Sequence, residues 1–232
     1  ALIRWQHPEL GLLLPGAFLP GVENDAVGLE LGEWVIRTAL AQLSAWKDAG
    51  LQLPVSVNVG AYQLQHPGFV DRLSHMLDQH PEVDHHHLEI EVLESSAMRD
   101  IARVAATLQE CQAMGVRFAL DDFGTGYSSL TYLRRLQAET IKIDRSFVID
   151  MLDDADDLAI VNGIIGLARA FGREVIAEGV ESQAHGERLM ALGCDQAQGY
   201  GVARPMPAHA LPAWIAFWQD QPPWVSFEEI SP

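Results

Sequence analysis

The sequence predicts an α/β fold of the TIM-like (β/α)8 barrel type, and two observations predict it. Short apolar runs suited to buried strands alternate with longer segments of helical apolar spacing along nearly all of the 232 residues. Such alternation is typical of a parallel sheet with right-handed crossovers. Polar residues also recur near the carboxyl end of one strand after another, where TIM barrels carry their active sites.

The apolar runs indicate one strand fewer than a closed barrel needs. The expected strands begin at Ala1, Val55, Leu88, Arg117, Thr140, Glu174 and Gln196. Because the first of them starts abruptly, we expect residues 1–232 to lack the first barrel strand and the domain to be N-terminally truncated. The expected barrel domain covers residues 1–220, and residues 221–232 form a C-terminal tail.

Helices are expected between these strands. They cover residues 31–46, 69–77, 101–108, 127–136, 160–171, 189–192 and 211–218. The first has Trp34 on one broad apolar face, and Gly115, Gly172 and Gly193 follow three of the others as C-terminal caps.

Composition excludes several kinds of partner. A net charge of −17 and a pI near 4.7 argue against binding a nucleic-acid polymer, because so acidic a protein repels a phosphate backbone. Any phosphate ligand must therefore be held locally. Cys111 and Cys194 show no metal-type spacing and fit reduced packing residues of an intracellular protein. No apolar run reaches the roughly 18 residues of a membrane span, so we expect a cytoplasmic domain without membrane contact, in a parent protein that could be membrane-anchored.

The stretch Leu120–Ser129 poses the central chemical problem, because Asp121 and Asp122 follow a buried strand directly. Burying paired negative charge is costly unless a positive group lies between the charges. A divalent cation with oxygen ligands, Mg²⁺ or Mn²⁺, would supply it. The alternatives are a plain turn with a helix cap, or the Asp-Phe-Gly tripeptide of protein kinases. The kinase alternative lacks its glycine-rich loop and its His-Arg-Asp motif in this sequence.

Unusual polar residues lie near the carboxyl ends of successive expected strands. They are Asn58, Glu91, Asp121, Asp122, Lys142, Glu178 and Gln198. Such oxygen ligands suit one or two Mg²⁺ or Mn²⁺ ions, which can activate water and clamp an in-line displacement at phosphorus. Lys142 could orient that water or neutralise charge on a phosphoryl oxygen. The residue chemistry therefore predicts metal-dependent phosphoester hydrolysis, although each residue alone has a structural explanation.

Two other clusters resemble metal sites but fit structural roles better. His85, His86 and His87 precede a strand, and imidazole prefers softer metals than the oxygen cluster suits. The aspartates between Asp150 and Asp157 lack the glycine and final glutamate of an EF-hand loop. An acidic helix start is the favoured interpretation there.

With these residues assembled, the chain resembles the EAL domain, the bacterial phosphodiesterase of cyclic di-GMP, over nearly its whole length. Ala1-Leu2-Ile3-Arg4-Trp5 is similar to the end of the signature Glu-Ala-Leu-x-Arg, whose initial Glu would lie just before residue 1. Further family motifs follow in order at Val57-Asn58, Glu91, Asp121–Ser129, Lys142-Ile143-Asp144, Glu178–Glu181 and Gln198–Tyr200. Leu93 and Gly60 depart from the Thr and Ser usual in the family.

The resemblance implies a role for each matching residue. The implied metal ligands, for two Mg²⁺ or Mn²⁺ ions, are Asn58, Glu91, Asp121, Asp122 and Glu178. The implied catalytic residues are Lys142, Glu178, Asp121 and Glu94, with Lys142 positioning the water and Glu94 holding the Asp121 loop in place. The implied substrate-binding residues are Leu2, Arg4, Asp144, Glu181 and Gln198.

The resemblance also implies a function: hydrolysis of cyclic di-GMP to linear pGpG in second-messenger signalling. It implies a homodimer whose contact lies near the Asp121 loop, and an upstream sensor or GGDEF domain. Two alternatives remain open, a receptor that binds cyclic di-GMP without hydrolysing it and a barrel enzyme that acts on another phosphodiester.

Overall fold

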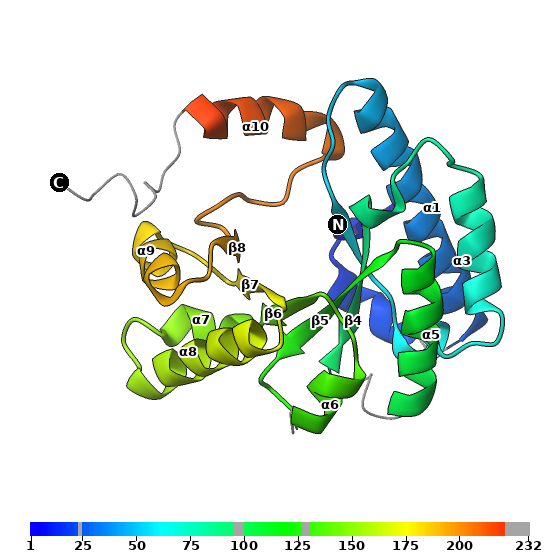
Figure 1. Cartoon of the computed structure of the whole chain (residues 1–232). Helices are drawn as coiled ribbons and strands as arrows, with labels where there is room; N and C mark the ends of the chain where they lie inside the picture. Colours follow the sequence, from blue (N-terminus) through cyan, green and yellow to red (C-terminus); the bar gives the residue numbers. More distant parts are fainter. Residues whose placement is uncertain (23–24, 95–99, 127–129, 221–232) are drawn as a thin grey trace. The chain divides into compact units, whose positions relative to one another are not determined.

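Strands and helices alternate along the chain in the computed structural model, which describes residues 1–22, 25–94, 100–126 and 130–220 (Figure 1). The strands are β1 (Trp5–His7), β2 (Gly11–Leu13), β3 (Val55–Asn58), β4 (Leu88–Leu93), β5 (Arg117–Phe123), β6 (Thr140–Ile143), β7 (Glu174–Glu178) and β8 (Gln196–Gln198). The α-helices are α1 (Ala26–Asp48), α2 (Ala61–Leu64), α3 (Phe69–Asp78), α5 (Ile101–Ala113), α6 (Leu130–Arg135), α7 (Arg145–Asp150), α8 (Ala155–Ala170), α9 (Gln183–Leu192) and α10 (Leu211–Asp220). The 3-10 helices are η1 (Pro15–Ala17), η2 (Leu19–Gly21), η3 (His85–His87) and η4 (Ala208–Ala210).

Contacts divide the chain into two compact units. Unit 1 comprises Ala1–Leu120 with Ser129–Glu139, and unit 2 comprises Asp121–Ser128 with Thr140–Pro232. Within the described residues, six strands form a sheet in the order β3-β4-β5-β6-β7-β8, and β5 begins in unit 1 and ends in unit 2. The pairs β3–β4, β6–β7 and β7–β8 are parallel. The predicted alternation around a parallel sheet is confirmed.

Unit 1 packs its long helices against its strands. Helix α1 begins at Asp25, whose side chain accepts hydrogen bonds from the backbone of Val27 and Gly28. Its buried face carries Ile36, Leu40 and other apolar residues at helical spacing. Trp34, predicted on that face, is 49% exposed. The apolar pattern predicted the helix correctly, but it did not predict which of its apolar residues are buried.

Unit 2 contains β6, β7 and β8 with α7, α8 and α9. Helix α8 begins at Asp154, whose carboxylate accepts from the backbone N–H groups of Asp156 and Asp157. The predicted acidic helix start is therefore confirmed. The helix ends two residues before Gly172, which has a φ of 64°, and α9 ends directly before Gly193, which has a φ of 86°.

The N-terminal segment differs from the prediction. Residues 1–4 form no strand, and β1 pairs antiparallel with β2 in a separate two-stranded sheet. The turn between them is held by His7, whose Nδ1 accepts from the backbone N–H groups of Glu9 and Leu10, both at 3.1 Å. Ala1 instead donates its amino group to the carbonyl of Ser56 beside β3. The prediction of a barrel strand starting at Ala1 was wrong, because a short apolar run does not reveal its pairing partner.

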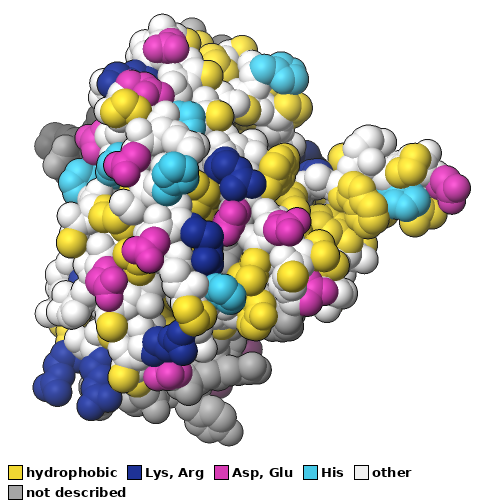
Figure 2. Space-filling view, turned by 90° about the vertical axis from the view of Figure 1, so that its right-hand side faces the viewer, with side chains coloured by type: hydrophobic (Ala, Val, Ile, Leu, Met, Phe, Trp, Pro, Cys, Tyr) yellow, Lys and Arg dark blue, Asp and Glu magenta, His cyan; other side chains and the backbone are white. Residues whose placement is uncertain are grey.

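The remaining segments fit structural roles. His85 lies in η3, where its Nδ1 is 2.8 Å from the carbonyl oxygen of Met114, so this imidazole anchors the turn before β4. Expected helix residues 127–129 and the tail 221–232 lie outside the described residues. In the part of the chain that is described, no helix has the length and apolar character to span a membrane. Basic and acidic side chains are interspersed on the face drawn in Figure 2.

Candidate metal centre

A buried lysine and a carboxylate on neighbouring strands of unit 2 form the base of the site. Lys142 lies on β6 between Ile141 and Ile143, both fully buried, and is itself only 3% exposed. The parallel register pairs Lys142 with Ile176, so Lys142 and Glu178 share one face of the sheet. Lys142 Nζ lies 2.5 Å from Glu178 Oε1 and 3.1 Å from Asp121 Oδ1. A buried ammonium group is thus charge-paired by two carboxylates.

Three carboxylates converge beside this lysine. Asp121, Asp122 and Glu178 each present an oxygen within 4.8 Å of the others. Asp121 Oδ1 is buried and accepts no hydrogen bond within the described residues, because its contact with Lys142 is an ion pair without hydrogen-bond geometry. One ammonium charge faces three carboxylates, and the buried Asp121 Oδ1 accepts no hydrogen bond from any residue that the structure describes. This donor set fits a hard divalent cation such as Mg²⁺ or Mn²⁺.

The backbone at Asp122 is unusual. Its φ of 53° is the only positive value at a non-glycine residue in the described part of the chain. Such a conformation costs on the order of 1–3 kcal/mol and is concentrated at functional sites. The turn is held by Thr125, whose hydroxyl donates to the Asp122 carbonyl at 2.9 Å. Gly124 follows with a φ of 105°, and a Cβ there would lie 3.0 Å from Phe147. With this turn, the neighbouring residues Asp121 and Asp122 both present a carboxylate oxygen to the same cluster.

The pKa values of Asp122 and Asp144 are shifted in opposite directions. Burial, the neighbouring charge of Asp121 and a hydrogen bond with Asp144 raise the pKa of Asp122 to about 6. Burial would also raise the pKa of Asp144, but the Ser146 hydroxyl and backbone N–H both donate to its carboxylate and lower that pKa. Asp122 is thus the weaker acid of the two, and below a pH of about 6 it can donate its proton to Asp144.

Unit 1 supplies a second pair of predicted site residues. Asn58 on β3 and Glu91 on β4 are register partners, and Asn58 Nδ2 donates to Glu91 Oε2 at 2.8 Å. Two residues earlier on each strand, the Ser56 hydroxyl donates to Glu89 Oε1 at 2.8 Å. These bonds explain how two nearly buried glutamates are tolerated on one face of β4. The assignment of Asn58 and Glu91 as metal ligands stays a prediction.

The other predicted residues occupy varied positions. Glu94 is 5% exposed and follows β4 directly. Leu2 is 52% exposed, and Arg4 donates to the carbonyl of Ile3. Their predicted roles in catalysis and substrate binding remain predictions.

Two more of the predicted residues lie on unit 2, near the end of β7. Gln198 on β8 is exposed and pairs in register with Glu178, so it lies at the same level of the sheet as a proposed ligand. Glu181 is exposed and lies in the segment that leaves β7.

One site feature escaped the sequence reasoning. Asp144 caps α7 and lies beside Asp122, whose pKa it helps to raise, and its predicted contact with substrate stays a prediction. Ser146, which donates to it, was not singled out. The spacing Asp-x-Ser at a strand-to-helix junction is typical of a side-chain cap and could have revealed this partner.

Together the fold and the cluster define an α/β protein of the TIM-barrel type with an acidic centre able to hold a metal ion. Within that class, the chain belongs to the EAL domain family, whose model matches residues 1–205. The predicted family and fold are confirmed.

Relatives named as cyclic di-GMP enzymes share much of the sequence. The bifunctional diguanylate cyclase/cyclic di-GMP phosphodiesterase MucR of Pseudomonas aeruginosa is 45% identical over 217 residues, covering 93% of this chain and 32% of MucR. The cyclic di-GMP phosphodiesterase PdeR of Escherichia coli is 36% identical over 214 residues, covering 92% of this chain and 32% of PdeR. This chain therefore spans about a third of the length of these curated relatives.

Solved structures agree with the family assignment. The structure described as the PaMucR phosphodiesterase in complex with c-di-GMP matches with a TM-score of 0.87 and 45% identity, over 91% of this chain and 85% of that one. The EAL domain of Mycobacterium smegmatis DcpA matches with a TM-score of 0.76 and 35% identity, over 89% and 87% of the two chains.

Proposed function

We propose that this chain hydrolyses cyclic di-GMP to linear pGpG in a reaction that depends on Mg²⁺ or Mn²⁺. The observation that carries the proposal is the buried cluster of Lys142 with the carboxylates of Asp121, Asp122 and Glu178. Relatives 45% and 36% identical that are named as cyclic di-GMP phosphodiesterases support the choice of substrate.

The metal ligands in this proposal are Asp121, Asp122, Glu178, Asn58 and Glu91, serving two ions. When bound, the ions supply positive charge that makes water a better nucleophile and stabilises charge on the phosphate oxygens. Asp121 can bind through the buried oxygen that accepts no hydrogen bond within the described residues. Asp122 loses its proton to become a ligand, and its pKa near 6 allows this at neutral pH.

Lys142 acts at the reacting phosphate. Its ammonium group is fixed by Glu178 and Asp121, so it can donate a hydrogen bond to the attacking water or to a phosphoryl oxygen without reorganising. The water oxygen bonds to phosphorus as the bond from phosphorus to the 3′ oxygen breaks, and the net transfer of one water proton to the 3′ oxygen lets it leave as a hydroxyl. One phosphodiester of the ring opens, which yields pGpG.

The remaining assignments are proposals of the same kind. Leu2, Arg4, Asp144, Glu181 and Gln198 would bind substrate. Glu94 would hold the loop that carries Asp121.

The test is a direct assay with the protein as it occurs naturally. Incubation with cyclic di-GMP and Mg²⁺ or Mn²⁺ should give pGpG by chromatography, and an excess of chelator should stop it. Binding of cyclic di-GMP without pGpG would instead identify a receptor. Absence of both binding and product would contradict the proposed substrate.

We also propose that residues 1–220 form the catalytic domain, with 221–232 as a tail, in a cytoplasmic homodimer joined to an upstream sensor or GGDEF domain. Light scattering of the purified protein tests the dimer: a mass twice that of the chain supports it, and equal turnover by a proven monomer argues against a role in activity.

A further inference from the structure

The segment that leaves β7 is held on one side by two glycines that follow β8. A Cβ on Gly199 would lie 2.7 Å from the carbonyl carbon of Val180, and one on Gly201 would lie 2.7 Å from that of Glu181. Gly201 N–H also donates to the Val180 carbonyl at 2.8 Å. The backbone of residues 180–181, from which the Glu181 side chain extends, is therefore held against the backbone after β8.

On its other side the same segment is anchored by a buried histidine. His185 is 9% exposed, and its Nδ1 lies 2.7 Å from the hydroxyl of Ser182, the N-cap of α9. Its Nε2 lies 3.1 Å from the carbonyl oxygen of Ile149. Because a carbonyl can only accept, Nε2 carries the proton, and in the neutral ring Ser182 donates to Nδ1. His185 thus joins the end of the segment to α7.

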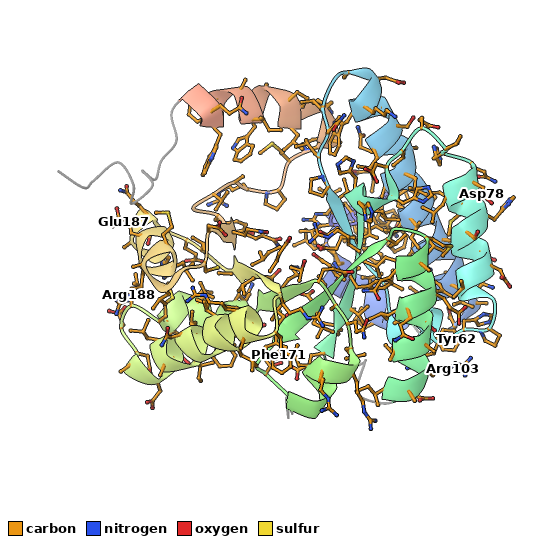
Figure 3. All side chains as sticks on the ribbon, in the orientation of Figure 1. Tyr62, Asp78, Arg103, Phe171, Glu187 and Arg188 are labelled. Carbon is orange, nitrogen blue, oxygen red and sulfur yellow. The ribbon has the colours of Figure 1, made fainter. Side chains whose placement is uncertain are left out.

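Helix α7 links the His185 contact at Ile149 to Asp144 at its other end, next to the candidate metal centre. Ile149 lies in its last turn, and Asp144, its N-cap, lies beside the carboxyl group of Asp122. On α9, Glu187 and Arg188 point outward, as Figure 3 shows, whereas His185 is buried. The imidazole is therefore a polar group of α9 that is buried and bonded on both ring nitrogens.

We propose that His185 is a positioning residue: by bridging Ser182 and the Ile149 carbonyl, it fixes Glu181 relative to α7 and Asp144. The catalytic part of this inference rests on the proposed function. The positional part does not, since it concerns only the residues of unit 2 in the absence of any ligand. Loss of the bridge should let the segment after Glu178 move while the sheet stays folded.

The test compares three variants. His185→Leu removes both hydrogen bonds at similar volume, His185→Gln keeps an N–H that can donate to the Ile149 carbonyl, and Cys194→Ala is a control. Cys194 is buried in unit 2, just before β8, so its truncation perturbs packing without touching the bridge. The readouts are kcat and KM for cyclic di-GMP, the Tm, and hydrogen–deuterium exchange of residues 179–186 in metal-free protein.

His185→Leu should lower kcat ~10–100-fold, the loss typical when an outer partner that orients a site residue is removed. It should also raise exchange in residues 179–186, with His185→Gln recovering most of both effects and Cys194→Ala changing only the Tm. Wild-type kcat and exchange in His185→Leu would overturn the inference, as would equal losses in Cys194→Ala.

The test still decides if His185→Leu does not fold or if the wild type is inactive. If His185→Leu does not fold, Ser182→Ala replaces it, and its kcat and exchange are judged in the same way. If the wild type hydrolyses no cyclic di-GMP, the proposed function fails by itself, and exchange alone decides whether His185 positions the segment.

Discussion

Lys142 Nζ and Glu178 Oε1 lie 2.5 Å apart across two neighbouring parallel strands, and the lysine is 3% exposed. This ion pair makes the cluster of three carboxylates tolerable in a folded chain, because it places one fixed positive charge among them. It leaves a net negative site, which is the condition for binding divalent cations.

Lys142→Ala should impair catalysis more than folding when the metal is present. The loss of a fixed charge at the reacting phosphate should lower kcat about 100–1000-fold. In metal-free protein the unpaired carboxylates should lower the free energy of unfolding by about 3–5 kcal/mol, and saturating Mn²⁺ should recover part of that loss. Steady-state kinetics and urea unfolding with and without Mn²⁺ measure both effects. Unchanged kcat, or equal destabilisation in both conditions, contradicts the assignment.

Asp121→Ala and Glu178→Ala should each abolish turnover. Both remove a carboxylate from the centre where oxygens lie within 4.8 Å of one another. Mn²⁺ should raise the Tm of the wild type through preferential binding to the folded state, and this shift should shrink or vanish in both variants. Thermal unfolding over a Mn²⁺ titration is the measurement, with Arg188→Ala on the outer face of α9 as the control. A wild-type shift in Asp121→Ala would remove that residue from the metal centre.

Much of this cluster was predictable because parallel strands place their carboxyl ends at one edge. Alternating strands and helices therefore brought Asp121, Lys142 and Glu178 together without knowledge of any contact. The hydrogen bond between Asp122 and Asp144 could not be predicted. It depends on a positive φ at Asp122 and on local burial, neither of which follows from residue type.

The errors in the predicted fold have similar physical causes. Ala1 lies beside β3 through its amino group, while Trp5–His7 turns back onto Gly11–Leu13. Both segments are short and apolar, so composition alone predicts extended chain without its partner. Trp34 illustrates the same limit in a helix, since the apolar face on which it was predicted does not bury its side chain, which is half exposed.

The stability of the metal-free protein should fall as pH rises from 5 to 8. The pKa of Asp122 is raised to about 6 in the folded state from an ordinary value of 3.8, so the folded state holds this proton more tightly than the unfolded state does. The stabilisation is fully present below pH 3.8 and is lost as pH passes 6. After a discount for solvent screening it amounts to about 1–2 kcal/mol. The lowered pKa of Asp144 acts at more acidic pH.

Urea unfolding between pH 5 and 8 in the presence of chelator measures this effect. Asp122→Asn should flatten the profile and raise stability at pH 8, because an amide carries no charge to desolvate. A wild-type profile that rises over this range, or is unchanged by the substitution, contradicts the assigned titration.

Neither cysteine should react with iodoacetamide in the folded protein at pH 8. Cys111 is fully buried and Cys194 is 4% exposed, and burial raises the pKa of the two thiols to about 12 and about 11. Only the thiolate is nucleophilic, so both access and reactivity are suppressed. Mass spectrometry should find no labelled cysteine in native protein and two in urea. Rapid native labelling at Cys111 would show that the core around α5 opens.

Gly199→Ala should destabilise unit 2 and impair the proposed reaction, whereas Gly163→Ala should stabilise it. A Cβ on residue 199 would overlap the backbone of Val180, which is tied to the neighbouring strand by the bond from its N–H to the Gln198 carbonyl. Neither backbone can move without breaking this pairing, so we expect a loss of about 3 kcal/mol or more together with a lower kcat. Gly163 lies on the exposed face of α8, and a Cβ there meets no atom within 4 Å.

Alanine at position 163 should therefore add about 0.5–1 kcal/mol through helix propensity alone and leave kcat unchanged. Urea unfolding and steady-state kinetics on the two variants give the comparison. Both variants replace a glycine by alanine. Opposite changes in the free energy of unfolding would therefore show that the loss comes from the close contact between Gly199 and the backbone of Val180. Equal stability of the two variants would mean that this contact is looser than the structure has it, and Glu181 would then lack the support on which its proposed role depends.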